Sequence, residues 1–82
     1  MTNIIFYSKA GCPWGTEVRE FLTSRNIPFV EKEMMHNPEF KEECIQKTGQ
    51  SKCPTLDIDG HYLTDSDAKA VEEYLRQISK LE

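Results

Sequence analysis

The sequence places one residue where it could act as a nucleophile, Cys12 in the run Gly11-Cys12-Pro13-Trp14-Gly15. A short apolar segment precedes this run and an amphipathic helical pattern follows it, so the thiol faces the unpaired N–H groups of a helix start. Those groups and the helix dipole favour thiolate over thiol. A dithiol C-x-x-C site would have its second cysteine at position 15, where this chain has glycine. The pattern indicates a redox site without its usual resolving partner.

The elements on either side of Cys12 are predicted from apolar spacing. Residues 4–7 form a β-rich apolar run, typical of a strand that is buried on both faces. A helix is favoured from Pro13 onward, because the first helical position needs no N–H donor. Residues 26–28 end that helix, and residues 29–34 alternate well enough for a second strand.

A second helix is predicted from the signals at its two ends. Asn37 is expected to cap it, Pro38 to begin it and Gly49 to stop it. Cys44 falls on its narrow apolar face beside Phe40, so we expect this cysteine to pack in the core rather than to react.

A hairpin and a last helix complete the pattern. The strands Thr55–Ile58 and His61–Leu63 are joined by an Asp-Gly pair, which is a strong hairpin signal. The last helix is expected to begin near residues 64–66, with Thr64 and Asp67 as a capping box. The predicted order is β-α-β-α-β-β-α.

This order predicts an α/β protein with a four-stranded mixed sheet and three helices, which is the thioredoxin fold. The first β-α-β unit should be a right-handed parallel crossover, and the hairpin adds antiparallel strands. With 82 residues and no visible repeat or linker, residues 1–82 are expected to form a single domain.

Composition excludes several function classes. The net charge is −4 and no Lys/Arg cluster is present, which argues against nucleic acid or an anionic membrane as the main partner. No apolar run approaches the roughly 20 residues that span a bilayer. Three cysteines are too few and too scattered for a secreted disulfide scaffold, which favours a reducing cytoplasm. His36 and His61 show no ligand-like spacing, so no metal site is expected.

The chain resembles the glutaredoxin family from Asn3 to about Ile78. The resemblance rests on the order and spacing of these motifs: Phe6-Tyr7-Ser8-Lys9, Cys12-Pro13-Trp14-Gly15, Thr48-Gly49, Cys53-Pro54-Thr55, Ile58-Asp59-Gly60 and Ser66-Asp67. It is also similar to the short glutaredoxin-like proteins of anaerobic bacteria, some of which carry selenocysteine where this chain has Cys12.

The resemblance implies a glutathione-linked thiol–disulfide oxidoreductase that works by a monothiol mechanism. Cys12 thiolate would take glutathione from a mixed disulfide, and a second glutathione would release it as oxidised glutathione. This route needs no thiol at position 15. It also agrees with the general requirements of exchange, which are an attacking thiolate and an accessible sulfur.

The resemblance further implies a glutathione-binding groove. Its expected residues are Lys9, Trp14, Lys41, Cys53, Pro54, Ser66 and Asp67. Lys9 and Lys41 match positions that bind the glycine carboxylate, and Lys9 also favours the thiolate. Ser66 and Asp67 match the pair that binds the γ-glutamyl end, the first through N–H groups and the second through its carboxylate.

Around the expected cis-proline Pro54 and the last helix, the chain departs from the family pattern. Cys53 stands before the proline, where glutaredoxins usually have an aliphatic residue; it is either a small core residue or a substitute resolving thiol. Thr64 and Asp65 replace a Gly-Gly pair. The Asp65 carboxylate would repel a carboxylate bound nearby, so we expect it to weaken glutathione binding.

Glutathione is thus the expected co-substrate, and glutathionylated or disulfide-bearing proteins are the expected partners of a cytoplasmic monomer. Two alternatives stay open. Single-cysteine relatives can carry a [2Fe–2S] cluster between protomers with glutathione, although Pro13-Trp14-Gly15 replaces the Gly-Phe-Ser usual in such carriers. The chain could instead donate electrons to one dedicated redox enzyme.

Overall fold

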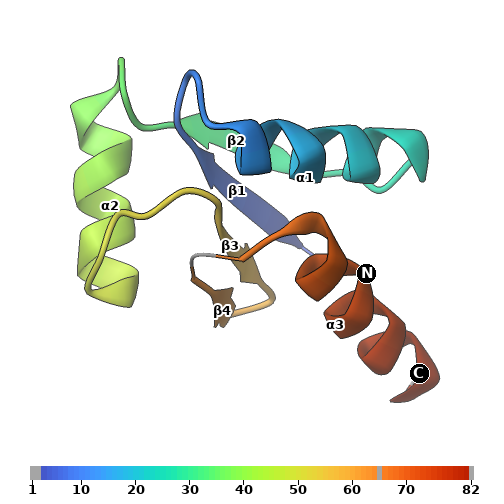
Figure 1. Cartoon of the computed structure of the whole chain (residues 1–82). Coiled ribbons are helices and arrows are strands. Elements are labelled where there is room, and N and C mark those ends of the chain that lie inside the picture. Colours follow the sequence, from blue (N-terminus) through green and yellow to red (C-terminus); the bar gives the residue numbers. More distant parts are fainter. Residues whose placement is uncertain (1–2, 65, 82) are drawn as a thin grey trace.

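The computed structural model describes residues 3–64 and 66–81, which form a four-stranded sheet and three helices (Figure 1). The elements in chain order are β1 (Ile4–Ser8), α1 (Pro13–Ser24), β2 (Val30–Glu33), α2 (Pro38–Thr48), β3 (Thr55–Ile58), β4 (His61–Leu63) and α3 (Ala68–Leu81). This is the predicted β-α-β-α-β-β-α order, and the thioredoxin fold is confirmed.

The sheet has the strand order β2-β1-β3-β4. β1 runs parallel to β2 and antiparallel to β3, and β4 pairs antiparallel with β3. Tyr7, near the end of β1, lies opposite Thr55, the first residue of β3. The segment that leaves β1 and the segment that enters β3 therefore lie at the same edge of the sheet. The first segment ends at Cys12, and the second contains Cys53 and Pro54.

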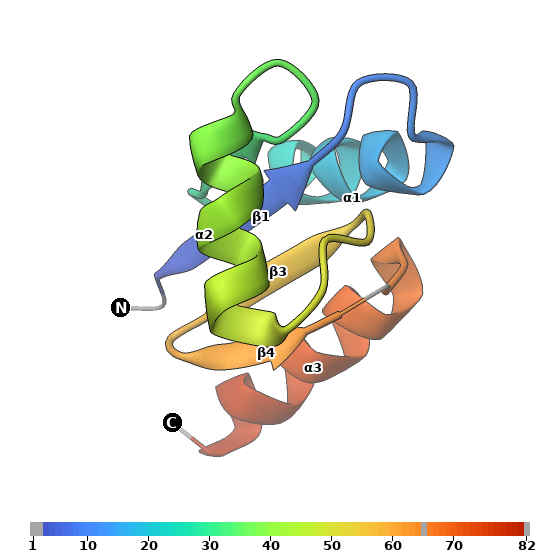
Figure 2. The same cartoon turned by 90° about the vertical axis from the view of Figure 1, so that its left-hand side faces the viewer.

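The helices form two layers on opposite faces of the sheet, with α1 and α3 on one face and α2 on the other (Figures 1 and 2). Side chains alternate along β1, as the period of a strand requires. Ile4 and Phe6 enter the larger core beneath α1 and α3, whereas Tyr7 enters a smaller cluster beneath α2 with Met34 and Cys44. The apolar residues of both faces of β1 are thereby covered.

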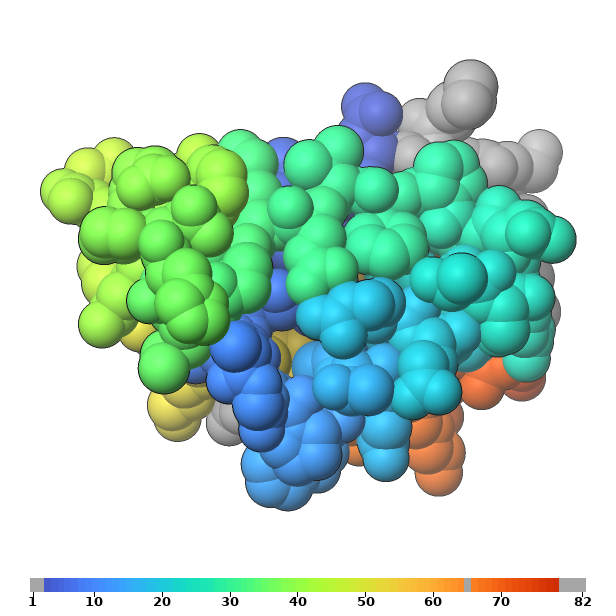
Figure 3. All heavy atoms as spheres, turned by 90° about the horizontal axis from the view of Figure 1, so that it is seen from above, coloured from blue at the N-terminus to red at the C-terminus, as the bar shows by residue number. Residues whose placement is uncertain are grey.

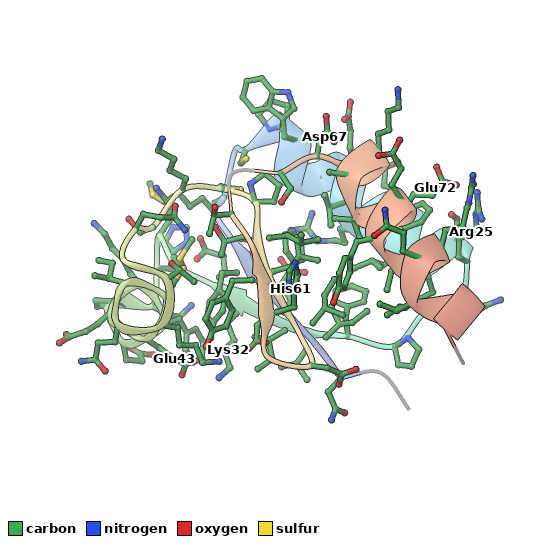
Figure 4. The ribbon with its side chains drawn as sticks, turned by 90° about the horizontal axis from the view of Figure 1, so that it is seen from below. Arg25, Lys32, Glu43, His61, Asp67 and Glu72 are labelled. Carbon is green, nitrogen blue, oxygen red and sulfur yellow. The ribbon has the colours of Figure 1, made fainter. Side chains whose placement is uncertain are left out.

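Ion pairs join the helices to their neighbours at positions away from Cys12. Arg25, at the end of α1, contacts Glu72 of α3 at 3.1 Å, and Lys32 of β2 contacts Glu43 of α2 at 2.8 Å. Figure 4 shows the first pair on the α3 side of the sheet and the second on the α2 side.

Two local predictions differ from the structure. α3 begins at Ala68 rather than near residues 64–66, because the Asp67 carboxylate accepts the Ala70 N–H at 2.9 Å and so caps the helix itself. Residues 29–34 were expected to form the second strand, but β2 is confined to Val30–Glu33. Asp65, with its expected effect on glutathione, lies outside the described residues. In the described part of the chain, every helix is too short or too polar to cross a bilayer.

Candidate active site

Cys12 is the N-cap residue of α1, and its side chain is partly exposed. The Gly15 N–H donates to the Cys12 sulfur at 3.4 Å. The Cys12 N–H in turn donates to the Lys9 carbonyl at 3.1 Å, which closes a turn directly before the helix. The predicted position of the thiol at a helix start is confirmed. A negative sulfur there is stabilised by the N–H donor and by the positive end of the helix dipole.

A carboxylate at the end of β2 holds the loop before Cys12. Glu33 accepts the Ala10 N–H at 3.0 Å, the Met35 N–H at 2.7 Å and the His36 N–H at 2.8 Å. Partial burial disfavours its charged form, but these N–H donors outweigh burial and lower the pKa of Glu33 from 4.5 to about 2. The loop that carries Lys9 and Cys12 is thus fastened to β2. Sequence reasoning missed Glu33, although an acidic residue at the end of a parallel strand is a usable signal.

Cys53, in the segment before β3, brings a second sulfur close to Gly15 and Cys12. The peptide bond between Cys53 and Pro54 is cis, as predicted. A Cβ atom added at Gly15 would lie 2.9 Å from the Cys53 sulfur and 3.5 Å from the Cys12 sulfur. Burial, followed by a hydrogen bond with Cys12, raises the pKa of the Cys53 thiol above 9.0. At neutral pH this thiol is therefore protonated and can donate to the Cys12 sulfur.

Two surface hollows adjoin the cysteine pair, and Trp14 and Cys53 belong to both. One is lined by Trp14, Cys53, Ser66, Asp67 and Ala70. The other is lined by Lys9, Ala10, Gly11, Cys12, Pro13, Trp14, Met35, Lys52 and Cys53. Trp14, in the first turn of α1, is 58% exposed and lines both hollows. Seen from above in Figure 3, the blue atoms around the start of α1 protrude between the green atoms that follow β2 and the cyan atoms further along α1.

Ser66 and Asp67, which directly precede α3, both line the first hollow. Asp67 lies at the amino end of α3 in Figure 4. The Ser66 N–H is already donated to the Pro54 carbonyl at 3.1 Å. The Ser66 hydroxyl, in contrast, is buried without a hydrogen-bond partner in the part of the chain that the structure describes. This hydroxyl, rather than the amide, is the group of Ser66 that could bind a ligand.

The other predicted residues divide between the site and the rest of the fold. Lys9 lines the second hollow beside Cys12, but Lys41 is exposed on α2 and lines neither hollow. Cys44 is fully buried beneath α2, where it bonds the Gln50 carbonyl at 3.4 Å, in agreement with its expected packing role. Within residues 3–64 and 66–81, His, Cys, Asp and Glu form no cluster that could hold a metal ion.

Comparison with known proteins identifies the family of this domain. A family model described as glutaredoxin matches residues 4–63, which is more than half of the chain. The chain belongs to the glutaredoxin family. This glutaredoxin is a thiol–disulfide oxidoreductase, and the family to which it belongs uses glutathione as co-substrate.

Individual relatives agree with this assignment. The chain is 28% identical over 74 residues to an uncharacterised glutaredoxin-like 8.6 kDa protein encoded in a rubredoxin operon of Clostridium pasteurianum, covering 90% of this chain and 99% of the relative. It is 28% identical over 67 residues to glutaredoxin 3 of Escherichia coli K12, covering 82% and 81% of the two chains. A solved mutant of a thioredoxin-like protein superposes with a TM-score of 0.80 at 22% identity, covering 88% of this glutaredoxin and 97% of that chain.

Proposed function

We propose that this glutaredoxin removes glutathione from mixed disulfides and that Cys12 is the nucleophile which receives it. The observation that carries the proposal is the placement of the Cys12 sulfur. It is partly exposed, it accepts the Gly15 N–H at a helix start, and Cys12 lines the second of the two hollows together with Lys9. A sulfur in that position is accessible and is stabilised as an anion, which are the two requirements of disulfide exchange.

The reaction has two exchange steps. The Cys12 thiolate attacks the glutathione sulfur of the mixed disulfide, and the substrate sulfur leaves as a thiolate that takes a proton from water. A glutathione thiolate then attacks the glutathione sulfur held on Cys12, which releases oxidised glutathione and restores the Cys12 thiolate. The net result is one free thiol on the substrate and one molecule of oxidised glutathione.

Glutathione is proposed to lie across the two hollows, with its cysteine near Cys53 and Pro54. Lys9 offers a positive charge to one carboxylate in the second hollow. In the first hollow, beside Trp14, the Ser66 hydroxyl and the Asp67 carboxylate offer hydrogen bonds to the γ-glutamyl end, and this hydroxyl has no partner among residues 3–64 and 66–81. Lys41 remains a proposed contact, although it lies outside both hollows and a ligand would have to reach it beyond them.

We propose that the enzyme acts as a monomer in the cytoplasm on glutathionylated or disulfide-bearing proteins. The cytoplasm keeps thiols reduced, which the recycling step requires. The family's use of glutathione as co-substrate supports this assignment.

Turnover of a glutathionylated peptide by glutathione tests the proposal. Oxidised glutathione is followed through glutathione reductase and NADPH. We expect Cys12→Ser to fall to the rate without enzyme. Cys44→Ser, the matched removal of a thiol from beneath α2, should keep the wild-type rate. Wild-type turnover by Cys12→Ser would refute the assignment of the nucleophile.

A further inference from the structure

The space above Gly15 brings two sulfur atoms together. The Cys53 sulfur lies 2.9 Å, and the Cys12 sulfur 3.5 Å, from the point where a Cβ atom on residue 15 would sit. Any other side chain at this position would push the Cys53 sulfur aside, since real Cβ contacts are essentially never shorter than 3.0 Å. Gly15, which stands where a C-x-x-C site has its second cysteine, thus also allows Cys53 to approach Cys12.

We propose that Cys53 is the resolving thiol of this enzyme and forms an intramolecular disulfide with Cys12. The proposal rests on the proposed function, because it requires Cys12 to receive a substrate sulfur first. It goes beyond that function by adding a second route of release, which uses no glutathione and would allow the enzyme to reduce disulfides that lack glutathione.

The chemistry of this route is a second exchange on the same sulfur. After Cys12 has formed a mixed disulfide, the Cys53 thiol loses its proton to water and its sulfur attacks the Cys12 sulfur. The Cys12–Cys53 bond forms, the bond from Cys12 to the substrate sulfur breaks, and that sulfur leaves as a thiolate and is protonated. The enzyme is oxidised by two electrons and the substrate disulfide is reduced by two. One glutathione thiolate then attacks the enzyme disulfide, and a second displaces it as oxidised glutathione, which returns the enzyme to the dithiol.

The surroundings of Cys53 order these steps. Burial is the main cause of its raised pKa, and the hydrogen bond and charge of Cys12 raise it further. The hydrogen bond and the charge of Cys12 no longer act once Cys12 is in a mixed disulfide, because its sulfur is then neutral. Lys9 acts in the opposite direction: its backbone N–H donates a hydrogen bond to the Cys53 sulfur, and this bond and the Lys9 charge lower the pKa of Cys53. Both effects of Lys9 remain after Cys12 has formed the mixed disulfide. Cys53 therefore becomes more acidic after the first step, when its thiolate is needed.

The third cysteine cannot take this role. Cys44 lies in the separate cluster beneath α2 with Tyr7 and Met34, on the other face of the sheet from the larger core. Its thiol is fully buried and bonds the Gln50 carbonyl, and burial raises its pKa. Cys44 is therefore the matched control for removal of a thiol.

One equivalent of dithiodipyridine, a small disulfide whose leaving group absorbs light, tests the proposal on the whole chain. The first exchange releases one thiopyridone and leaves an adduct on Cys12. Attack by Cys53 then releases a second and leaves no adduct. Wild type and Cys44→Ser should therefore release two equivalents, whereas Cys53→Ser should release one and keep its adduct. Tryptic digestion identifies the linkage, because residues 10–19, 42–47 and 53–69 each carry one of the three cysteines.

The two releases separate this proposal from the proposed function. A joined pair of peptides 10–19 and 53–69 in wild type supports the resolving role. If wild type releases only one equivalent and keeps its adduct on peptide 10–19, Cys53 does not resolve, although Cys12 is still the nucleophile. If no release depends on Cys12, with Cys12→Ser equal to wild type, the proposed function fails and the resolving role fails with it.

Discussion

The Cys53 sulfur occupies space that is open only because residue 15 is glycine, 2.9 Å from where its Cβ atom would be. Cys53 precedes β3 and Gly15 lies in the first turn of α1, so the contact joins two segments that are far apart in the chain. Compared with a C-x-x-C site, this chain lacks the cysteine at position 15 and has a cysteine at position 53 instead. The two differences fit together, because the Cys53 sulfur occupies the space that a side chain at position 15 would need.

Gly15→Ala should separate the two release steps of the dithiodipyridine experiment. The added methyl group displaces the Cys53 sulfur but leaves the Gly15 N–H in place for Cys12. We expect the first release to be unchanged and the second to slow by about tenfold or more, as misplaced reacting groups do. Alanine favours a helix by about 1 kcal/mol over glycine, which offsets part of the cost of displacing the sulfur, so the variant should still fold. A second release at the wild-type rate would show that this contact does not position Cys53.

Lys9 and Lys41 offer a direct test of where the glutathione carboxylate binds. Lys9 lines the hollow beside Cys12, whereas Lys41 lines neither hollow. A hydrogen bond to a charged group contributes about 1.5–3 kcal/mol, so Lys9→Gln should raise KM for the glutathionylated peptide by about tenfold or more. Lys41→Gln should have the smaller effect when the two variants are measured side by side. The reverse order would move the carboxylate site to α2.

Ser66→Ala should separate ligand binding from stability. Because the Ser66 hydroxyl is buried and finds no hydrogen-bond partner among the described residues, its removal should not lower the free energy of unfolding measured in urea. If this hydroxyl binds glutathione, KM should rise several-fold while kcat changes little. Lower stability with unchanged KM would mean that the hydroxyl serves the fold and not the ligand.

Glu33 should make stability depend on pH in the acid range. Its pKa is about 2 in the folded protein and 4.5 ordinarily, so its contribution is complete above pH 4.5 and is lost as pH falls toward 2. Glu33→Gln, which keeps an acceptor oxygen but does not titrate, should therefore show a smaller loss of Tm between pH 5 and pH 2 than wild type. If wild type and Glu33→Gln lost the same Tm between pH 5 and pH 2, the role of this carboxylate in holding the loop would be contradicted.

Local patterns predicted most of the fold. The strand runs and the proline helix starts at Pro13 and Pro38 place the first six elements, because each depends on neighbours in the sequence. The start of α3 was predicted too early. Both Thr64 and Asp67 can cap a helix, and only the structure shows that the Asp67 carboxylate reaches the Ala70 N–H.

The site was predictable in its parts but not in its contacts. The positions of Cys12, Pro54 and Trp14 followed from the motifs. Two contacts depend on how β1, β2 and β3 are aligned, which no local pattern specifies. They are the hydrogen bond from the Ala10 N–H to Glu33 and the close approach of the Cys53 sulfur to Gly15. For the same reason, sequence alone left open whether Cys53 is a core residue or a thiol that reaches Cys12.

The most direct test of the account is to trap the covalent intermediate on Cys12. Cys53→Ser protein, mixed with one equivalent of a glutathionylated peptide and no free glutathione, should free the peptide thiol and hold glutathione on residues 10–19. Mass spectrometry of the quenched digest measures both. A glutathione adduct on residues 10–19 that free glutathione then removes is the predicted result. Release of the peptide thiol without any adduct on those residues would contradict the account.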